Sequence, residues 1–173
     1  MRLQILSVFL LLTCAFSSQA TQIYQTQDNF IHSIFGDVPK PRVIWLDEAL
    51  KQQIESILAH SFQPIRLRYW QQQQDTIWVL EEIGKESPIT VGIHIKQTQL
   101  QQIKVLVYRE SRGDEVRHAF FTDQFKAAEL TDSLELNKHI DGITGATLSV
   151  RALTKLSRIA LLLHNKVING DNV

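Results

Sequence analysis

The sequence predicts an α+β protein in which an antiparallel meander of about four strands packs with an N-terminal helix and a long C-terminal helix. Residues 47–61 and the segment from residue 147 to about 167 carry apolar side chains at helical spacing, whereas residues 65–108 alternate between apolar and polar. The strand-like segments follow one another through short connections, which favours antiparallel neighbours. A chain of 173 residues is expected to form one domain.

The first 20 residues have the pattern of a secretory signal peptide. Arg2 supplies a positive start, residues 3–16 are almost wholly apolar, and Ser18-Gln19-Ala20 is a small-x-small cleavage site. The apolar run is short for a transmembrane helix, although an uncleaved membrane anchor is the alternative. We therefore expect export to the periplasm and a mature domain of residues 21–173. Cys14 is the only cysteine, so that domain would hold no disulfide or thiolate.

The elements of the mature chain follow from the patterns in order. Residues 21–43 are expected to form an irregular N-terminal arm, because Gly36, Pro39 and Pro41 interrupt any regular pattern. Asp47 is a typical N-cap for the helix of residues 47–61. Alternation then predicts the strands, which are residues 65–70, 76–83, 89–97 and 100–108. Residues 110–118 are charged and contain a glycine, which indicates a functional or flexible loop, and residues 126–140 are expected to be mostly loop.

The most informative segment is residues 141–149, Asp-Gly-Ile-Thr-Gly-Ala-Thr-Leu-Ser, which leads directly into the C-terminal helix. The first turn of a helix has unpaired N–H groups and the positive end of the helix dipole, so such a junction is suited to an anion. Thr147 places a hydroxyl at this position. The alternative is an ordinary helix cap preceded by small residues.

This segment resembles the flavinylation motif of the FMN-binding domain family, found in subunits of sodium-pumping NADH:quinone oxidoreductase and Rnf complexes. The family motif reads Asp-x-x-Ser/Thr-Gly-Ala-Thr/Ser-x-Ser/Thr, and its second Thr carries FMN through a phosphoester bond. The resemblance implies that Thr147 is the attachment residue. It also implies that the rest of the motif surrounds the cofactor; these residues are Asp141, Gly142, Thr144, Gly145, Ala146, Leu148 and Ser149.

A weaker resemblance lies upstream of the motif. The family has an acidic residue and a glycine-containing loop after a strand, and then an apolar-Gln-Phe element. Here either Glu110 or Arg112 would reach the edge of the flavin ring, and Phe121, Phe125 or Leu130 would form a wall of the slot. The loop departs from the Glu-Thr-x-Gly form of the respiratory subunits, since Ser-Arg-Gly-Asp stands at residues 111–114.

The resemblance also implies a function. A separate flavin transferase, which needs Mg²⁺ and uses FAD, would attach the FMN. The chain would then carry electrons between redox partner proteins, whether soluble or membrane-bound, and would be an electron-transfer module more than a stand-alone enzyme. Two alternatives are a non-covalent FMN binder and a flavin-free periplasmic adaptor that binds a partner through an exposed edge strand.

Composition and spacing argue against other functions. The 18 basic and 18 acidic residues balance, so no basic excess points to nucleic acid. The six histidines have no spacing typical of a metal site, and no hydrolase motif occurs, so neither a metal nor a catalytic residue is expected. Arg151, Lys155 and Arg158 form a basic stripe on the C-terminal helix, either a solvated face or a surface that steers an acidic partner.

Overall fold

The computed structural model describes residues 21–170, so the predicted signal peptide lies outside the described residues. The chain forms one six-stranded antiparallel sheet in the order β1-β6-β5-β4-β3-β2. The strands are β1 (Gln22–Ile23), β2 (Arg42–Trp45), β3 (Arg66–Gln72), β4 (Asp75–Ile83), β5 (Pro88–Lys96) and β6 (Gln99–Tyr108). The helices are α1 (Gln27–Phe35), α2 (Glu48–Leu58), α3 (Ala119–Thr122) and α4 (Thr147–Ile168), with short 3-10 turns η1 (Asp114–Arg117) and η2 (Asp123–Phe125).

The predicted meander is confirmed as β3 to β6, in which each strand pairs with the next one along the chain. The hairpin turns between β3 and β4 and between β5 and β6 are tight, and Gln73 and Gln97 adopt positive φ values of 51° and 56° there. The predicted helices are confirmed as α2 and α4. Asp47 caps α2, because its side chain accepts a hydrogen bond from the Leu50 N–H at 2.7 Å.

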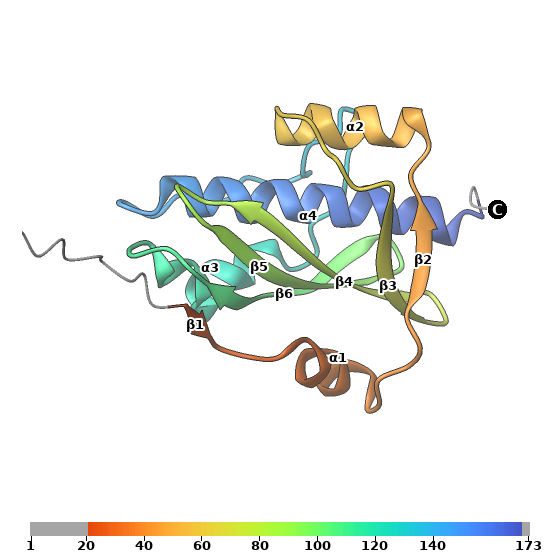
Figure 1. Ribbon diagram of the computed structural model, residues 1–173, viewed down its shortest axis with the longest axis horizontal. Coiled ribbons are helices and arrows are strands. Elements are labelled where there is room, and N and C mark those ends of the chain that lie inside the picture. The colour runs from red at the N-terminus through yellow and green to blue at the C-terminus, as the bar shows by residue number, and fades with distance from the viewer. Residues whose placement is uncertain (1–20, 171–173) are drawn as a thin grey trace, which may run out of the picture.

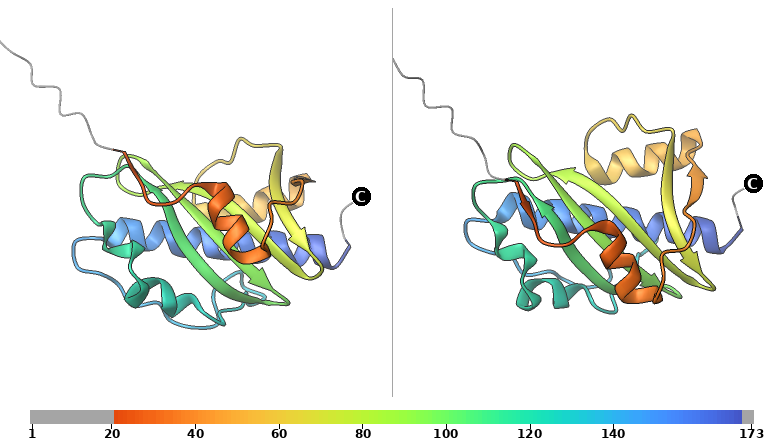
Figure 2. Two further views of the ribbon diagram at one scale, coloured as in Figure 1. Left: turned by 90° about the horizontal axis from the view of Figure 1, so that it is seen from below. Right: turned by 60° about the horizontal axis from the view of Figure 1, so that its bottom comes forward.

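The sheet lies between two layers of helices (Figure 1). α4 and α2 cover one face, where the larger core contains side chains from α2, α4 and the inward face of every strand from β2 to β6. The other face is covered by α1, which crosses the sheet as Figure 2 shows from below. The smaller core on that face is formed by Phe30, Ile31, Trp70, Ile77 and Leu106.

The prediction that residues 21–43 are irregular was wrong for most of this segment. It forms β1, α1 and the start of β2, and thereby supplies both outer strands of the sheet. Thr26 caps α1 through a hydrogen bond from the Asn29 N–H, and Gly36 ends the helix with a φ of 79°. The helix is fixed to the sheet at Gly92, where a Cβ atom would lie 2.6 Å from the Phe30 ring.

Two features bear on function at the level of the whole chain. Among residues 21–170, no helix is both long enough and apolar enough to cross a membrane. Within the same residues, no group of three or more histidine, cysteine, aspartate or glutamate side chains is placed to hold a metal ion.

Candidate flavin site

A pocket of about 420 Å³ lies at the N-terminal end of α4. Segments that are far apart in sequence form its walls: the turn between β4 and β5, the loop after β6, and the motif with the first turn of α4. Its volume lies in the range of about 300–1,000 Å³ that is usual for small-molecule sites. The lining residues are Lys85, Glu110, Ser111, Arg112, Gly145, Ala146, Thr147, Leu148 and Ser149.

The start of α4 offers free hydrogen-bond donors to this pocket. Ala146 is the N-cap residue, and its side chain cannot cap the helix. The described part of the chain provides no acceptor for the N–H groups of Thr147, Leu148 or Ser149, since the first bond of the helix is from Val150 to the Ala146 carbonyl. Gly145 turns the chain into the helix with a φ of 86°, a conformation that favours glycine. These donors and the helix dipole make the junction suitable for an anion.

Thr147 is the first residue of α4 and is exposed on the pocket wall. Within residues 21–170 its hydroxyl makes no hydrogen bond, and neither Thr147 nor Thr144 caps the helix. The structure therefore does not support the interpretation of the motif as an ordinary side-chain helix cap.

Ser149 has a supporting position behind the pocket. Its hydroxyl lies 2.9 Å from the Tyr108 Oη, which also donates a hydrogen bond to the Arg112 carbonyl at 2.6 Å. The serine and the tyrosine are both buried. Burial raises the pKa of the Tyr108 phenol, so it stays protonated as a donor. This contact joins the end of β6 and its loop to the first turn of α4.

Gly113 completes that junction because no larger residue fits there. A Cβ atom at Gly113 would lie 2.9 Å from the Tyr108 Oη, 3.1 Å from the Ser149 Oγ and 3.3 Å from the Ala146 Cβ. Its φ of 87° is also in the left-handed region. The loop of residues 110–113 can therefore pack closely against the motif.

Glu110 stabilises the wall of the pocket that is formed by the turn between β4 and β5. Its Oε1 accepts three backbone hydrogen bonds, from the N–H groups of Lys85 at 2.6 Å, Glu86 at 2.7 Å and Ser87 at 2.9 Å. Burial of the carboxyl group acts to raise the pKa of Glu110, but the three N–H donors outweigh burial and the pKa is lowered. The carboxylate is therefore ionised and fixes the turn between β4 and β5 beside the pocket.

Lys85 is a pocket residue that the sequence analysis did not select. It lies in the β4–β5 turn, and its ammonium group forms an ion pair with Glu86 at 2.9 Å. This pairing raises the pKa of Lys85, so the side chain is a cation at neutral pH. The exposed Arg112 guanidinium gives the pocket a second cation. A lysine in a turn between strands has no local pattern that marks it as part of a site.

Some predicted residues lie outside the pocket lining. Asp141, Gly142 and Thr144 are exposed residues of the segment that leads to it, and the Asp141 N–H donates to the Gln124 Oε1 at 2.7 Å. Phe125 is buried in the core, where its ring meets Phe121 edge-on at 5.5 Å between centroids. The Phe125 ring therefore belongs to the core and does not line the pocket.

The predicted basic stripe is not a continuous free surface. The Lys155 ammonium group donates to the Leu58 carbonyl and lies 3.3 Å from Glu82, which ties α4 to α2 and β4. The Arg158 guanidinium pairs with Glu135 at 2.7 Å. Only Arg151 of the three is fully exposed.

Comparison with known proteins agrees with this geometry. Residues 84–162 match the family model described as the FMN-binding domain, and this segment includes every residue that lines the pocket. Neither the search of curated proteins nor the search of solved structures found a match. The matched segment is just under half of the chain, and this FMN-binding domain match supports a flavin-binding protein.

Proposed function

We propose that FMN is attached to Thr147 through a phosphoester bond and that the loaded protein carries electrons between redox partners outside the cytoplasm. One observation carries the proposal: Thr147 lies on the wall of a pocket at a helix start, and within residues 21–170 neither its hydroxyl nor the first N–H groups of the helix have a hydrogen-bond partner. A phosphate bound there would be stabilised by these donors and by the helix dipole.

The residues present fit the cofactor. The N–H groups of the first turn would hold the phosphate, and the Lys85 and Arg112 cations would lie near the anionic parts of the cofactor. Glu110 keeps the β4–β5 turn in place, and Tyr108 with Ser149 keeps the helix start in place. When bound, FMN supplies one- and two-electron transfer.

The chain is not expected to attach the cofactor itself. A threonine hydroxyl is a weak nucleophile without a general base, and no described side chain accepts its proton. We propose that a flavin transferase supplies the base and Mg²⁺ and uses FAD. The Thr147 oxygen would bond to the flavin-side phosphorus, the pyrophosphate bond would break, and AMP would leave. Gly145, where a Cβ would meet nothing within 4 Å, leaves this approach open.

The deciding experiment is the intact mass of the denatured protein after coexpression with a flavin transferase. We expect a gain equal to FMN less one water on the peptide that contains Thr147, and we expect Thr147→Ala to abolish it. Thr98→Ala is the control, because Thr98 is an exposed threonine outside the motif and the pocket lining, and it should keep the flavin.

Other outcomes would contradict the covalent assignment. Covalent flavin on Thr147→Ala would exclude Thr147 as the attachment residue. Flavin that is released by acid precipitation, with no gain in mass, would show non-covalent binding. A protein that purifies without any flavin from these cells would return the adaptor alternative to first place.

Export is tested on the same sample. If residues 1–20 are a cleaved signal peptide, the N-terminal peptide of the periplasmic protein begins at Thr21. A protein that stays in the membrane fraction with Met1 present would instead establish the uncleaved anchor.

A further inference from the structure

The neighbouring strands β3 and β4 pair over only part of their lengths, which leaves an opening between them. The two strands pair only from Tyr69↔Trp78 to Gln72↔Asp75. Beyond that point the rest of β3 pairs only with β2, and the rest of β4 pairs only with β5. The two strands diverge from their shared hairpin, as Figure 1 shows. A central part of the sheet therefore lacks the usual contact between neighbouring strands.

Two hollows meet at this opening. On the α4 side, an apolar pocket of about 210 Å³ is lined by Leu58, Phe62, Pro64, Leu67, Val79, Leu80, Glu81, Leu156 and Ile159. On the α1 side, a wider and more polar hollow of about 520 Å³ is lined by Gln27, Val43, Pro64, Arg66, Leu67, Arg68, Trp70 and Val79. Pro64, Leu67 and Val79 line both, so the apolar hollow and the more polar one adjoin at the opening.

The mouth carries positive charge without a matching carboxylate. Arg66 and Arg68 are exposed at the same hollow. The Arg66 guanidinium stacks over the exposed Trp45 ring at 5.4 Å, and in the described chain no acceptor binds Arg68. Glu81, which lines the adjoining apolar pocket, already has partners, because it accepts from Thr90 and pairs with Arg109 at 3.5 Å. The complementary ligand is therefore an anion with an apolar body.

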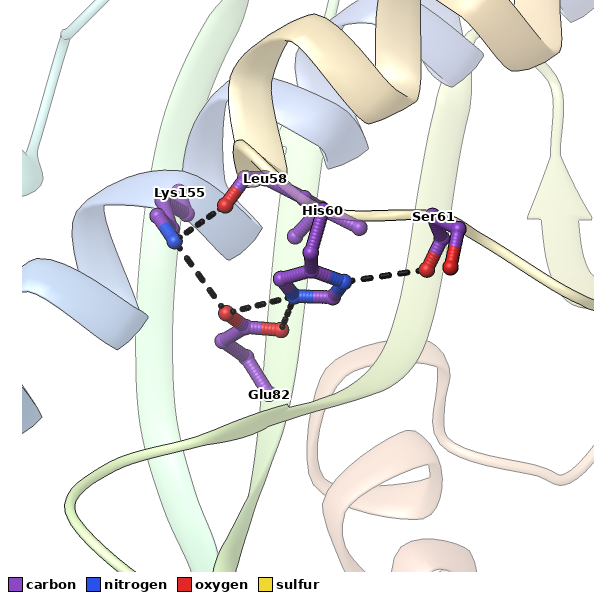
Figure 3. Close-up of polar contacts among 5 residues, drawn as sticks. All are labelled: Leu58, His60, Ser61, Glu82 and Lys155. Carbon is purple, nitrogen blue, oxygen red and sulfur yellow. Dashed lines mark hydrogen bonds and ion pairs between the residues drawn. The ribbon is translucent and has the colours of Figure 1, made fainter.

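The rim of the apolar pocket is fastened by polar contacts. Phe62, in the loop after α2, donates its N–H to the Glu55 Oε1 at 2.7 Å. In the same loop the His60 Nε2 lies 3.2 Å from both carboxylate oxygens of Glu82, and Lys155 bonds the Leu58 carbonyl (Figure 3). These contacts join the loop and the end of α2 to β4 and α4. The pocket is thus formed before any ligand enters.

The opening is separate from the flavin site. Leu156 and Ile159 lie nine and twelve residues after Thr147 on α4, which places them about 14–18 Å along the helix axis. The two lining sets share no residue.

We propose that the opening between β3 and β4 binds a linear monocarboxylate, with the hydrocarbon chain in the apolar pocket and the carboxylate on Arg66 and Arg68. An arginine can hold a carboxylate with two parallel hydrogen bonds, and the apolar lining excludes water from the chain. The site needs neither flavin nor Thr147.

The test is calorimetric titration of the protein, purified after expression of the full chain, with hexanoate, octanoate and decanoate below their micellar concentrations. Each added CH₂ should tighten Kd about fourfold until the pocket is full. 1-Octanol should bind at least tenfold more weakly than octanoate, because it lacks the charge. Affinities that do not depend on chain length, or equal affinities for the acid and the alcohol, would overturn the proposal.

Variants separate this site from non-specific binding. Arg68→Gln should weaken octanoate at least fivefold, whereas Arg151→Gln, at an exposed arginine on α4 that lines neither hollow, should leave Kd unchanged. Val79→Phe places a ring where the two hollows meet and should abolish binding. Thr147→Ala should bind as the unmodified chain does, which keeps this result independent of the flavin. Equal losses in the two arginine variants would show surface attraction only, and so would a folded Val79→Phe protein that still binds.

Discussion

Gly113 shows how one residue sets the geometry of the flavin site. It brings the loop after β6 against the first turn of α4, where a side chain would meet Tyr108, Ser149 and Ala146. Gly145 differs, since its φ is positive but its surroundings are open, and Gly142 has neither constraint. Substitutions at the three glycines can therefore distinguish the effect of crowding from the effect of backbone strain within one site.

These differences predict a graded effect of alanine. Gly142→Ala should change the free energy of unfolding by less than about 0.5 kcal/mol. Gly145→Ala should cost about 1–2 kcal/mol from left-handed backbone strain. Gly113→Ala should cost about 2–4 kcal/mol, because crowding adds to the strain. Urea unfolding of the three variants checks the order, and equal costs would contradict it.

Glu110 has an equally specific role at this scale. Glu110→Gln removes the charge that three backbone N–H groups share, so we expect a loss of about 1–3 kcal/mol at pH 7. Glu115→Gln is the exposed control and should be nearly neutral. The folded-state pKa of Glu110 lies below its ordinary value of 4.5. Its stabilisation is therefore present above pH 4.5 and is lost as the pH falls through the lowered value.

Urea titrations at several pH values test this linkage. The difference between the original chain and Glu110→Gln should shrink as the pH falls below 4.5. A difference that stays constant at all pH values would mean that the side-chain shape, and not the carboxylate charge, supports the turn.

At the scale of elements, α1 is held to the sheet by its fit over Gly92 as well as by apolar burial. Phe30 has no exposed surface, and its ring occupies the space that a side chain at Gly92 would need. Gly92 lies in β5, so the space that the Phe30 ring occupies is in the middle of the sheet. The fit also explains how a segment with two prolines and a glycine nevertheless becomes part of the fold.

Gly92→Ala should displace α1, because the new Cβ would lie 2.6 Å from the Phe30 ring. We expect a loss of about 1–3 kcal/mol from overpacking. Phe30→Leu alone should also destabilise, but it should cost less in the Gly92→Ala background. A double-mutant cycle measures this coupling, and purely additive effects would contradict direct contact.

At the scale of the whole molecule, three histidines make the free energy of unfolding depend on pH, and they do not all act in the same direction. Burial lowers the pKa of His164 and His94, despite the Gln97 carbonyl near His164 and Asp75 near His94. Their stabilisation is therefore present above the ordinary value of 6.5 and is lost as the pH falls below it. His60 has a raised pKa, because the Ser61 carbonyl and Glu82 favour its charged form, with Lys155 opposing them. Its contribution is lost as the pH rises through the raised value.

The buried His164 and the partly buried His94 should outweigh the exposed His60, so the protein should lose stability as the pH falls from 7.5 to 5.5. His60→Gln should make this decline steeper, since it removes the opposing group. His94→Gln should make the decline shallower. Chemical denaturation across this range checks both slopes, and a His60→Gln protein with a shallower decline would reverse the assigned sign.

The sequence by itself determined the features that depend on the order and spacing of residues close together in the chain. The spacing of apolar side chains identified α2, α4 and the strands β3 to β6, because a period of 3.6 or 2 directly reflects which face is buried. The motif of residues 141–149 predicted the FMN-binding domain family, which the family model matches over residues 84–162, because its residues are consecutive and the helix start is part of the motif.

Only the tertiary structure decided what depends on contacts between distant segments. Lys85 becomes part of the pocket because the β4–β5 turn and the end of β6, where the sequence already pointed to Glu110, meet at the start of α4. Phe125 enters the core, although its place in the sequence suggested the site. The opening between β3 and β4 follows from pairing with β2 and β5. No local pattern encodes which neighbour a strand keeps along its length, since that choice is made by the packing of the whole sheet.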